Sequence, residues 1–186
     1  AKICLLKDGE PERARKFEIA RAYRDMKGSG TPVRIPVIEM VEIGAGGGSI
    51  AHVPELTGAL RVGPQSAGAV PGPAAYDKGG TEPTVTDAHL ILGRLDPANF
   101  LGGRMPLDAE AARRAIETRI AAPLGLELQV ATDGILSIIE ANMANAIRSK
   151  TVARGLDPRE FVLLSYGGGG GLFAAEEDGS CANPSL

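Results

Sequence analysis

Glycine is concentrated in three segments of this 186-residue chain, and this distribution constrains the fold more than any other feature. The segments are residues 44–48, 63–80 and 167–171, within a total of 25 Gly and 13 Pro. Glycine adopts backbone conformations that other residues avoid, and it lets a ligand approach the backbone closely. Dense local clusters therefore indicate shaped loops rather than a uniformly low-complexity chain.

The first quarter of the chain is predicted to form strands. Two apolar stretches, at 3–6 and 17–19, flank residues 7–9, where Asp-Gly is a hairpin signal. A strand is also predicted over 37–43, after the last proline of that region. A second hairpin is predicted from Ser49 to Val62.

The segment 63–85 contains too many Pro and Gly residues for a regular element, but it is also rich in Ala. A flexible linker would be more polar, so the composition predicts a long ordered loop, and such loops are commonly functional. Thr86 and Asp87 are then expected to begin a short helix that ends at Gly93.

Two longer helices follow in the pattern. Asp108 is the expected N-cap of the first, which Pro123 and the following glycine stop. The second is predicted over 128–153, because apolar residues recur at helical spacing. A strand is predicted over 161–164, directly before the third glycine segment, and the order of elements indicates an α/β lobe.

Composition excludes several classes of function. The net charge is −3 and the charges are mixed along the chain, which argues against a nucleic-acid partner. Two distant cysteines and two histidines without ligand spacing argue against a disulfide framework or a zinc site. No apolar stretch is long enough to span a membrane, so a cytoplasmic location is the default expectation.

The two glycine segments that follow apolar runs could bind an anion through backbone N–H groups. Neither is a Walker A loop, since no Lys follows the last glycine, and neither matches Gly-x-Gly-x-x-Gly. The alternative is that these glycines serve tight turns and close packing only.

Five strings in this order and spacing resemble the hydantoinase A family, which includes 5-oxoprolinases and the large subunits of acetone and acetophenone carboxylases. The strings are VEIGAGGGSIAHV, LRVGPQSAGAVPGPAAY, GGTEPTVTDAHLILGRLDP, ANMANAIR and RGLDPREFVLLSYGGGGGL. The resemblance runs over residues 1–175, and residues 176–186 form a divergent or truncated tail.

The resemblance implies part of an actin-like ATPase (ribonuclease H-like) fold, namely one lobe with a helical subdomain. It also implies ATP with Mg²⁺ or Mn²⁺, a small-molecule substrate and a second enzyme subunit. The family's acidic phosphate motif would lie upstream of Ala1. Tyr166 to Gly171 resembles the adenosine motif, although Gly169 to Phe173 stand where the family usually reads Ala-Gly-Pro-Leu-His, and Ala75 replaces its usual Cys.

Site residues are expected from the same resemblance. The nucleotide is expected to contact Gly167, Gly168, Gly169 and Gly170, and phosphate or substrate to contact Gly46, Gly47, Gly48 and Ser49. Asp87 is a candidate metal ligand, with stabilisation of a helix N-terminus as the alternative. His52 and His89 are expected to be packing or surface residues, and Glu140 and Asn142 lie either on a solvated helix face or near the ligand.

The sequence is consistent with two functions. The first is a fragment of an ATP-dependent enzyme subunit that activates a cyclic amide (hydantoin, 5-oxoproline) for hydrolysis or a ketone for carboxylation. The second is a non-catalytic interaction or regulatory module derived from such an enzyme. The residues do not separate the substrates, because the groups that choose them can lie outside this sequence.

Overall fold

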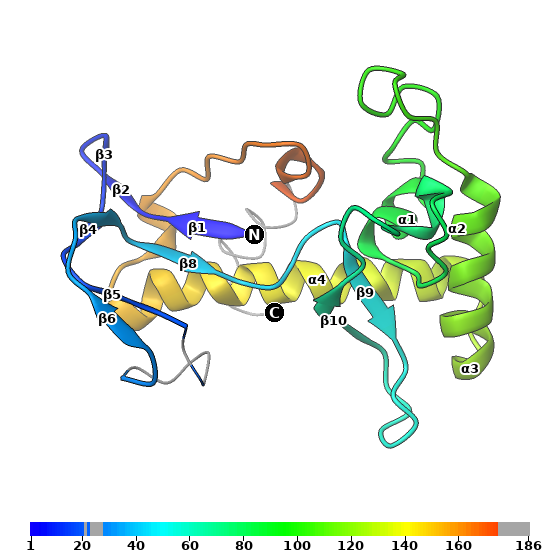
Figure 1. Cartoon of the computed structure of the whole chain (residues 1–186), viewed down its shortest axis with the longest axis horizontal. Helices are drawn as coiled ribbons and strands as arrows, with labels where there is room; N and C mark the ends of the chain where they lie inside the picture. The colour runs from blue at the N-terminus through cyan, green and yellow to red at the C-terminus, as the bar shows by residue number, and fades with distance from the viewer. Residues whose placement is uncertain (21, 23–27, 175–186) are drawn as a thin grey trace. The chain divides into compact units, whose positions relative to one another are not determined.

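The computed structural model describes residues 1–20, 22 and 28–174 (Figure 1). The chain divides into two compact units. Unit 1 comprises Ala1 and residues 43–186, and unit 2 comprises residues 2–42. The tail predicted at 176–186 lies outside the described residues.

Unit 2 is built from short antiparallel strand pairs. The predicted turn at Asp8-Gly9 is confirmed, and both residues have positive φ, at 53° and 80°. Its second arm is residues 10–11 rather than 17–19, which pair elsewhere, and the strand predicted over 37–43 is divided in two at Glu39. The pairs are β1 (Lys2–Cys4) with β8 (Met40–Glu42), β2 (Leu6–Lys7) with β3 (Glu10–Pro11), β4 (Arg13–Ala14) with β7 (Val37–Ile38), and β5 (Phe17–Ile19) with β6 (Thr31–Val33).

Unit 1 begins with the second predicted hairpin. β9 (Ser49–His52) pairs with β10 (Arg61–Ser66), and the register shifts by a bulge between Val62 and Ser66. β10 therefore continues into the segment that the sequence predicted to be loop. A bulge accommodates Gly and Pro within a strand because it relaxes the ladder locally.

The remainder of the predicted loop, residues 67–84, is ordered and turns once as a 3₁₀ helix at Ala74–Tyr76. α1 (Val85–Ile91) follows it. Its N-cap is Thr84 and not Thr86, so the expected helix start was two residues late. The reason is a capping box: the Thr84 side chain accepts from the Asp87 N–H, and the Asp87 carboxylate accepts from the Thr84 N–H.

α2 (Ala109–Ile116) begins at the predicted N-cap, where the Asp108 carboxylate accepts from the Ala111 N–H at 2.9 Å. The helical path continues through a π-helical segment (Glu117–Ala121) and α3 (Ala122–Leu124). It ends at Gly125, whose φ of 64° provides the left-handed C-cap.

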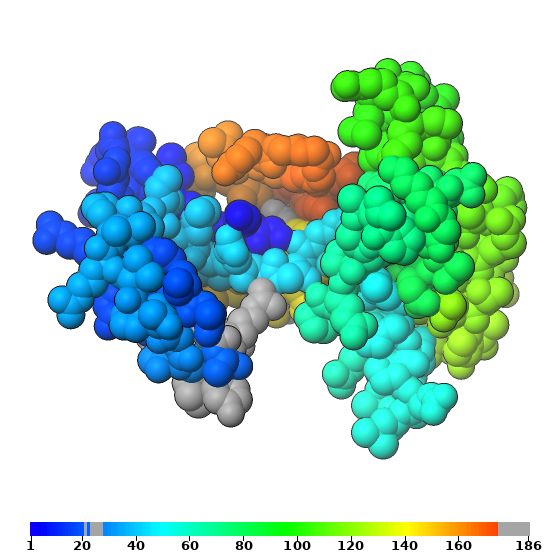
Figure 2. All heavy atoms as spheres, viewed as in Figure 1, coloured from blue at the N-terminus to red at the C-terminus, as the bar shows by residue number. Residues whose placement is uncertain are grey.

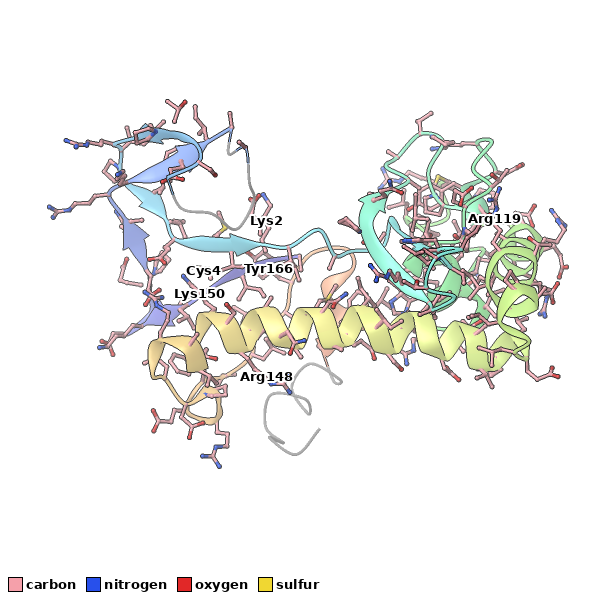
Figure 3. All side chains as sticks on the ribbon, turned by 90° about the horizontal axis from the view of Figure 1, so that it is seen from below. Lys2, Cys4, Arg119, Arg148, Lys150 and Tyr166 are labelled. Atoms are coloured by element: carbon pink, nitrogen blue, oxygen red, sulfur yellow. The ribbon has the colours of Figure 1, made fainter. Side chains whose placement is uncertain are left out.

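α4 (Leu128–Lys150) is the long helix that runs across Figure 1. Its predicted apolar stripe is largely confirmed and packs on α1, β9 and β10 in one core. The buried stripe residues are Ala131, Ile135, Ile139, Met143 and Ala146, whereas Ile138 and Ile147 are half-buried. The helix ends in basic residues, with Arg148 and Lys150 in its last turn (Figure 3).

Residues 161–164 do not form the predicted strand. In the part of the chain that the structure describes, no strand pairs with this segment, and alternate side chains face solvent. Val162 is 95% exposed and Leu164 is 74% exposed. A β-strand requires a neighbour for its backbone groups, so the apolar pattern alone was not sufficient.

The helices are short or polar relative to what a bilayer requires. Among the described residues, no single helix is long and apolar enough to cross a membrane, and only the bent pair 109–124 and 128–154, at 93°, passes when the two arms are combined.

Candidate functional site

α1 contacts two of the glycine-rich segments directly and meets Phe173 just beyond the third, although the three segments are far apart in the sequence. The Thr86 N–H donates to the Gly47 carbonyl at 2.8 Å. The Asp87 carboxylate accepts from the 63–80 segment. The His89 ring meets the ring of Phe173, just beyond the 167–171 segment, edge-on at a centroid distance of 4.8 Å. Three residues of one short helix, Thr86, Asp87 and His89, therefore link the first two loops and the residue that anchors the third.

The 44–49 loop is closed by its own serine. The Ser49 hydroxyl accepts from the Gly46 N–H at 3.1 Å and donates to the Gly44 carbonyl at 3.3 Å, and the side chain is buried. Both roles of the hydroxyl are filled inside the loop. Ser49 thus shapes the loop in this structure.

The glycines of this loop differ in the space around them. A Cβ at Gly47 would lie 2.7 Å from the Thr86 Oγ1, and a Cβ at Gly48 would lie 2.8 Å from the Ser66 Oγ. A Cβ at Gly46 would meet nothing within 4 Å. Packing explains two of the glycines, while Gly46 leaves the backbone accessible.

Asp87 is fully buried and accepts four hydrogen bonds. Its Oδ1 accepts from the Ala75 N–H at 2.8 Å. Its Oδ2 accepts from the Thr84 N–H and hydroxyl, both at 2.7 Å, and from the Ala74 N–H at 3.3 Å. Burial raises the pKa of the Asp87 carboxyl above its ordinary value, and the hydrogen bonds from Ala75, Thr84 and Ala74 offset part of that rise.

These donors support the structural interpretation of Asp87, in which the carboxylate fixes the helix start and the preceding loop. Its role as a metal ligand stays a prediction. Within residues 1–20, 22 and 28–174, no group of three or more His, Cys, Asp or Glu side chains is placed to hold a metal ion.

The 167–171 loop combines an open backbone with a buried anchor. Gly167 has a φ of 91°, and a Cβ at Gly167, Gly168 or Gly169 would meet nothing within 4 Å. Gly170 is different, because a Cβ there would lie 2.7 Å from the Ser165 Oγ. Phe173 is only 4% exposed and belongs to the core of unit 1.

The remaining candidates lie outside this arrangement or inside the core. His89 is buried, as expected for a packing residue, and His52 lies half-buried in β9. Glu140 pairs with Arg94 at 3.4 Å, and Asn142 is exposed on α4.

Sequence reasoning missed two residues that organise the site. Thr84 forms the capping box with Asp87, and Thr-x-x-Asp before an apolar run was a readable signal for it. Phe173 anchors the third glycine segment to α1, and no local pattern indicates that contact.

A family described as Hydantoinase/oxoprolinase matches residues 1–178. Caprolactamase subunit alpha of Pseudomonas jessenii is 48% identical over 151 residues, which are 80% of this chain and 22% of the relative. Acetophenone carboxylase gamma subunit of Aromatoleum aromaticum is 48% identical over 138 residues, which are 74% of this chain and 19% of the relative.

Two solved structures are similar over most of the chain. A nucleotide-free acetone carboxylase, from work on ATP-dependent acetone carboxylation, has a TM-score of 0.79 and 29% identity, and covers 97% of this chain and 27% of its own. An ATP-dependent caprolactamase from Pseudomonas jessenii has a TM-score of 0.76 and 44% identity, with 82% and 22% covered. These neighbours confirm the predicted α/β class and the lobe of an actin-like ATPase fold. The chain spans about a quarter of their length or less.

Proposed function

This chain belongs to the hydantoinase/oxoprolinase family, and we propose that it is the nucleotide-holding part of an ATP-dependent enzyme subunit. In the proposal, the enzyme activates the carbonyl oxygen of a cyclic amide for hydrolysis, or of a ketone for carboxylation, in the cytoplasm. Relatives named caprolactamase and acetophenone carboxylase support these two reaction types. Relatives named as alpha, gamma and beta subunits support a partner subunit.

The observation that carries the proposal is the 167–169 backbone, open on one side and held at its far end. A ligand can approach glycine backbone closely only where no Cβ intervenes, and here the space for three Cβ atoms is empty. Phe173 and His89 fix the loop against α1, so the open backbone is attached to the core and not to a free segment.

The open glycine backbone leaves room for a nucleotide, and we propose that Gly167, Gly168 and Gly169 contact it. Bound ATP would supply the phosphoryl group that activates the carbonyl oxygen. The described residues offer no cluster of acidic side chains for Mg²⁺ or Mn²⁺. Asp87 stays the candidate metal ligand from the sequence, and the proposal assigns no further ones.

A second feature supports association of this chain with another protein segment. Val162, Leu164 and Tyr166 alternate along the extended segment before the glycine loop, and each is more than 70% exposed. Figure 2 shows this segment, in orange, at the surface. Alternate apolar side chains in an extended segment are the pattern of a strand that pairs and packs. The segment that leads into the proposed nucleotide loop is thus suited to contact the rest of the enzyme.

Replacing Gly168 with Val tests the nucleotide assignment. The side chain would occupy the open space without displacing a neighbour, so we expect an unchanged melting temperature and the loss of ATP binding in the intact enzyme. Isothermal titration with a non-hydrolysable ATP analogue measures the second quantity. Wild-type affinity in this variant would overturn the assignment of the loop.

The substrate class is tested by measuring ADP release from the intact enzyme with each candidate. Release stimulated by hydantoin, 5-oxoproline or caprolactam would establish cyclic-amide activation, whereas release that requires a ketone and bicarbonate would establish carboxylation. No stimulation by either set would contradict the proposed activity.

A non-catalytic interaction module is the second candidate, and the exposed apolar strip at 162–166 favours it. Native mass spectrometry with and without Mg·ATP separates the two. A bound partner chain without any ATP-sized increment in mass supports the module, and an increment supports the nucleotide-holding role.

A further inference from the structure

Unit 2 contains a hollow of about 600 Å³ that is lined by three arginines. Arg13, Ala14 and Arg15 line it from one stretch of chain and Arg34, Ile35 and Pro36 from another, and none of these described lining residues is acidic. The proposed nucleotide loop is in unit 1, and the proposed function uses none of these residues.

The hollow lies at an irregularity in the pairing of the strands. β4 and β7 pair Ala14 with Val37, whereas the adjoining pair, β5 and β6, matches Phe17 with Val33. Two residues, 15–16, therefore face three, 34–36, which is the arrangement of a bulge. Pro36 has no N–H to donate, so the ladder is interrupted at that point. A bulge redirects side chains, and here it directs residues from both strands around one space.

Only one of the three arginines forms an ion pair with another described residue. Within the residues that the structure describes, Arg15 and Arg34 form no ion pair, and Arg13 reaches only Glu10, at an Nη2 to Oε2 distance of 4.0 Å. The surrounding sequence adds to this charge: residues 2–42 carry nine Lys or Arg and seven Asp or Glu, whereas the whole chain is at −3. Unit 2 is thus the basic part of an acidic chain.

We propose that this hollow binds a small organic phosphate. A guanidinium presents a planar pair of donors that matches phosphate oxygens, and three guanidinium groups match a multivalent anion better than a single carboxylate. The Ala14, Ile35 and Pro36 lining suits the carbon skeleton of such a molecule. The volume is in the range of small-molecule sites, about 300–1,000 Å³, and is too small for an extended nucleic acid.

The test is isothermal titration of the intact protein with pyrophosphate and with phenyl phosphate at low ionic strength. The double variant Arg15→Ala/Arg34→Ala should lower affinity at least tenfold. Arg15→Lys/Arg34→Lys should also weaken binding, because it keeps the charge but removes the planar pairs of donors. Lys16→Ala is the matched control: Lys16 is an exposed cation beside Arg15 that does not line the hollow, and its affinity should change less than twofold.

A second control separates this site from the nucleotide loop. Gly168→Val should leave phosphate binding at the hollow unchanged, and the arginine variants should leave binding of the ATP analogue unchanged. Wild-type affinity in Arg15→Ala/Arg34→Ala, or loss of phosphate binding in Gly168→Val alone, would overturn the proposal. So would tight binding of a poly-glutamate peptide without binding of either phosphate.

Discussion

Replacing Gly47 with Ala tests whether the first glycine segment is set by packing against α1. The added Cβ would lie 2.7 Å from the Thr86 Oγ1, and ordinary contact begins near 3.4 Å, so the two groups must separate by about 0.7 Å. Thr86 is buried and its N–H bonds to the Gly47 carbonyl, so this separation also strains a 2.8 Å hydrogen bond. Overpacking of this kind typically costs about 1–3 kcal/mol.

We therefore expect Gly47→Ala to lower the free energy of unfolding by about 2 kcal/mol, which is about 4–8 °C in melting temperature for a unit of this size. Urea unfolding followed by circular dichroism measures the change. Gly46→Ala is the matched control, because its Cβ would meet nothing within 4 Å and its φ is not in the left-handed region. Its stability should change by less than about 0.5 kcal/mol.

A double-mutant cycle then identifies the contact. Thr86→Ala removes the Oγ1 that the new methyl group meets, so the loss in Gly47→Ala/Thr86→Ala should be smaller than the sum of the two single losses by about 1 kcal/mol. Equal losses in Gly46→Ala and Gly47→Ala, or strict additivity in the cycle, would refute the packing argument.

Three further predictions concern other contacts. Asp87→Asn should cost about 2–4 kcal/mol in urea unfolding, because the amide cannot accept from all of the donors around it, whereas exposed Asp133→Asn should be near neutral. Phe173→Ala should cost about 3 kcal/mol and also weaken binding of the ATP analogue, since it removes the buried anchor of the glycine loop. The Arg159 side chain, by hydrogen bonding to the Asp157 carboxylate, lowers the pKa of that carboxyl to about 2. The ionised Asp157 carboxylate should contribute fully to local stability above about pH 4, and this contribution should be lost as pH falls through about 2. In Arg159→Ala, NMR titration of the Asp157 carboxyl should show a midpoint raised toward 3.8.

The sequence predicted the elements whose signals are local. The helix N-cap at Asp108, the left-handed end at Gly125 and the apolar stripe of α4 depend on neighbours within a few residues, and the structure has each of them. The hairpin at Asp8-Gly9 was found for the same reason, although its second strand was not, because pairing depends on residues far along the chain.

The arrangement of the site depends on contacts between residues far apart in the chain, which the sequence pattern does not reveal. The three glycine segments were visible in the sequence, but their meeting on α1 was not, because it depends on Thr86, Asp87 and His89 reaching residues up to 84 positions away. The strand expected at 161–164 failed for a related reason. Its apolar run has strand character, but the described residues contain no partner strand to complete it.

The attachment of three loops to one seven-residue helix has a mechanical consequence. α1 packs on α4, bonds to the 44–49 and 63–80 segments, and meets Phe173, two residues beyond the 167–171 segment. A displacement of α1 would therefore be transmitted to all three glycine-rich segments at once.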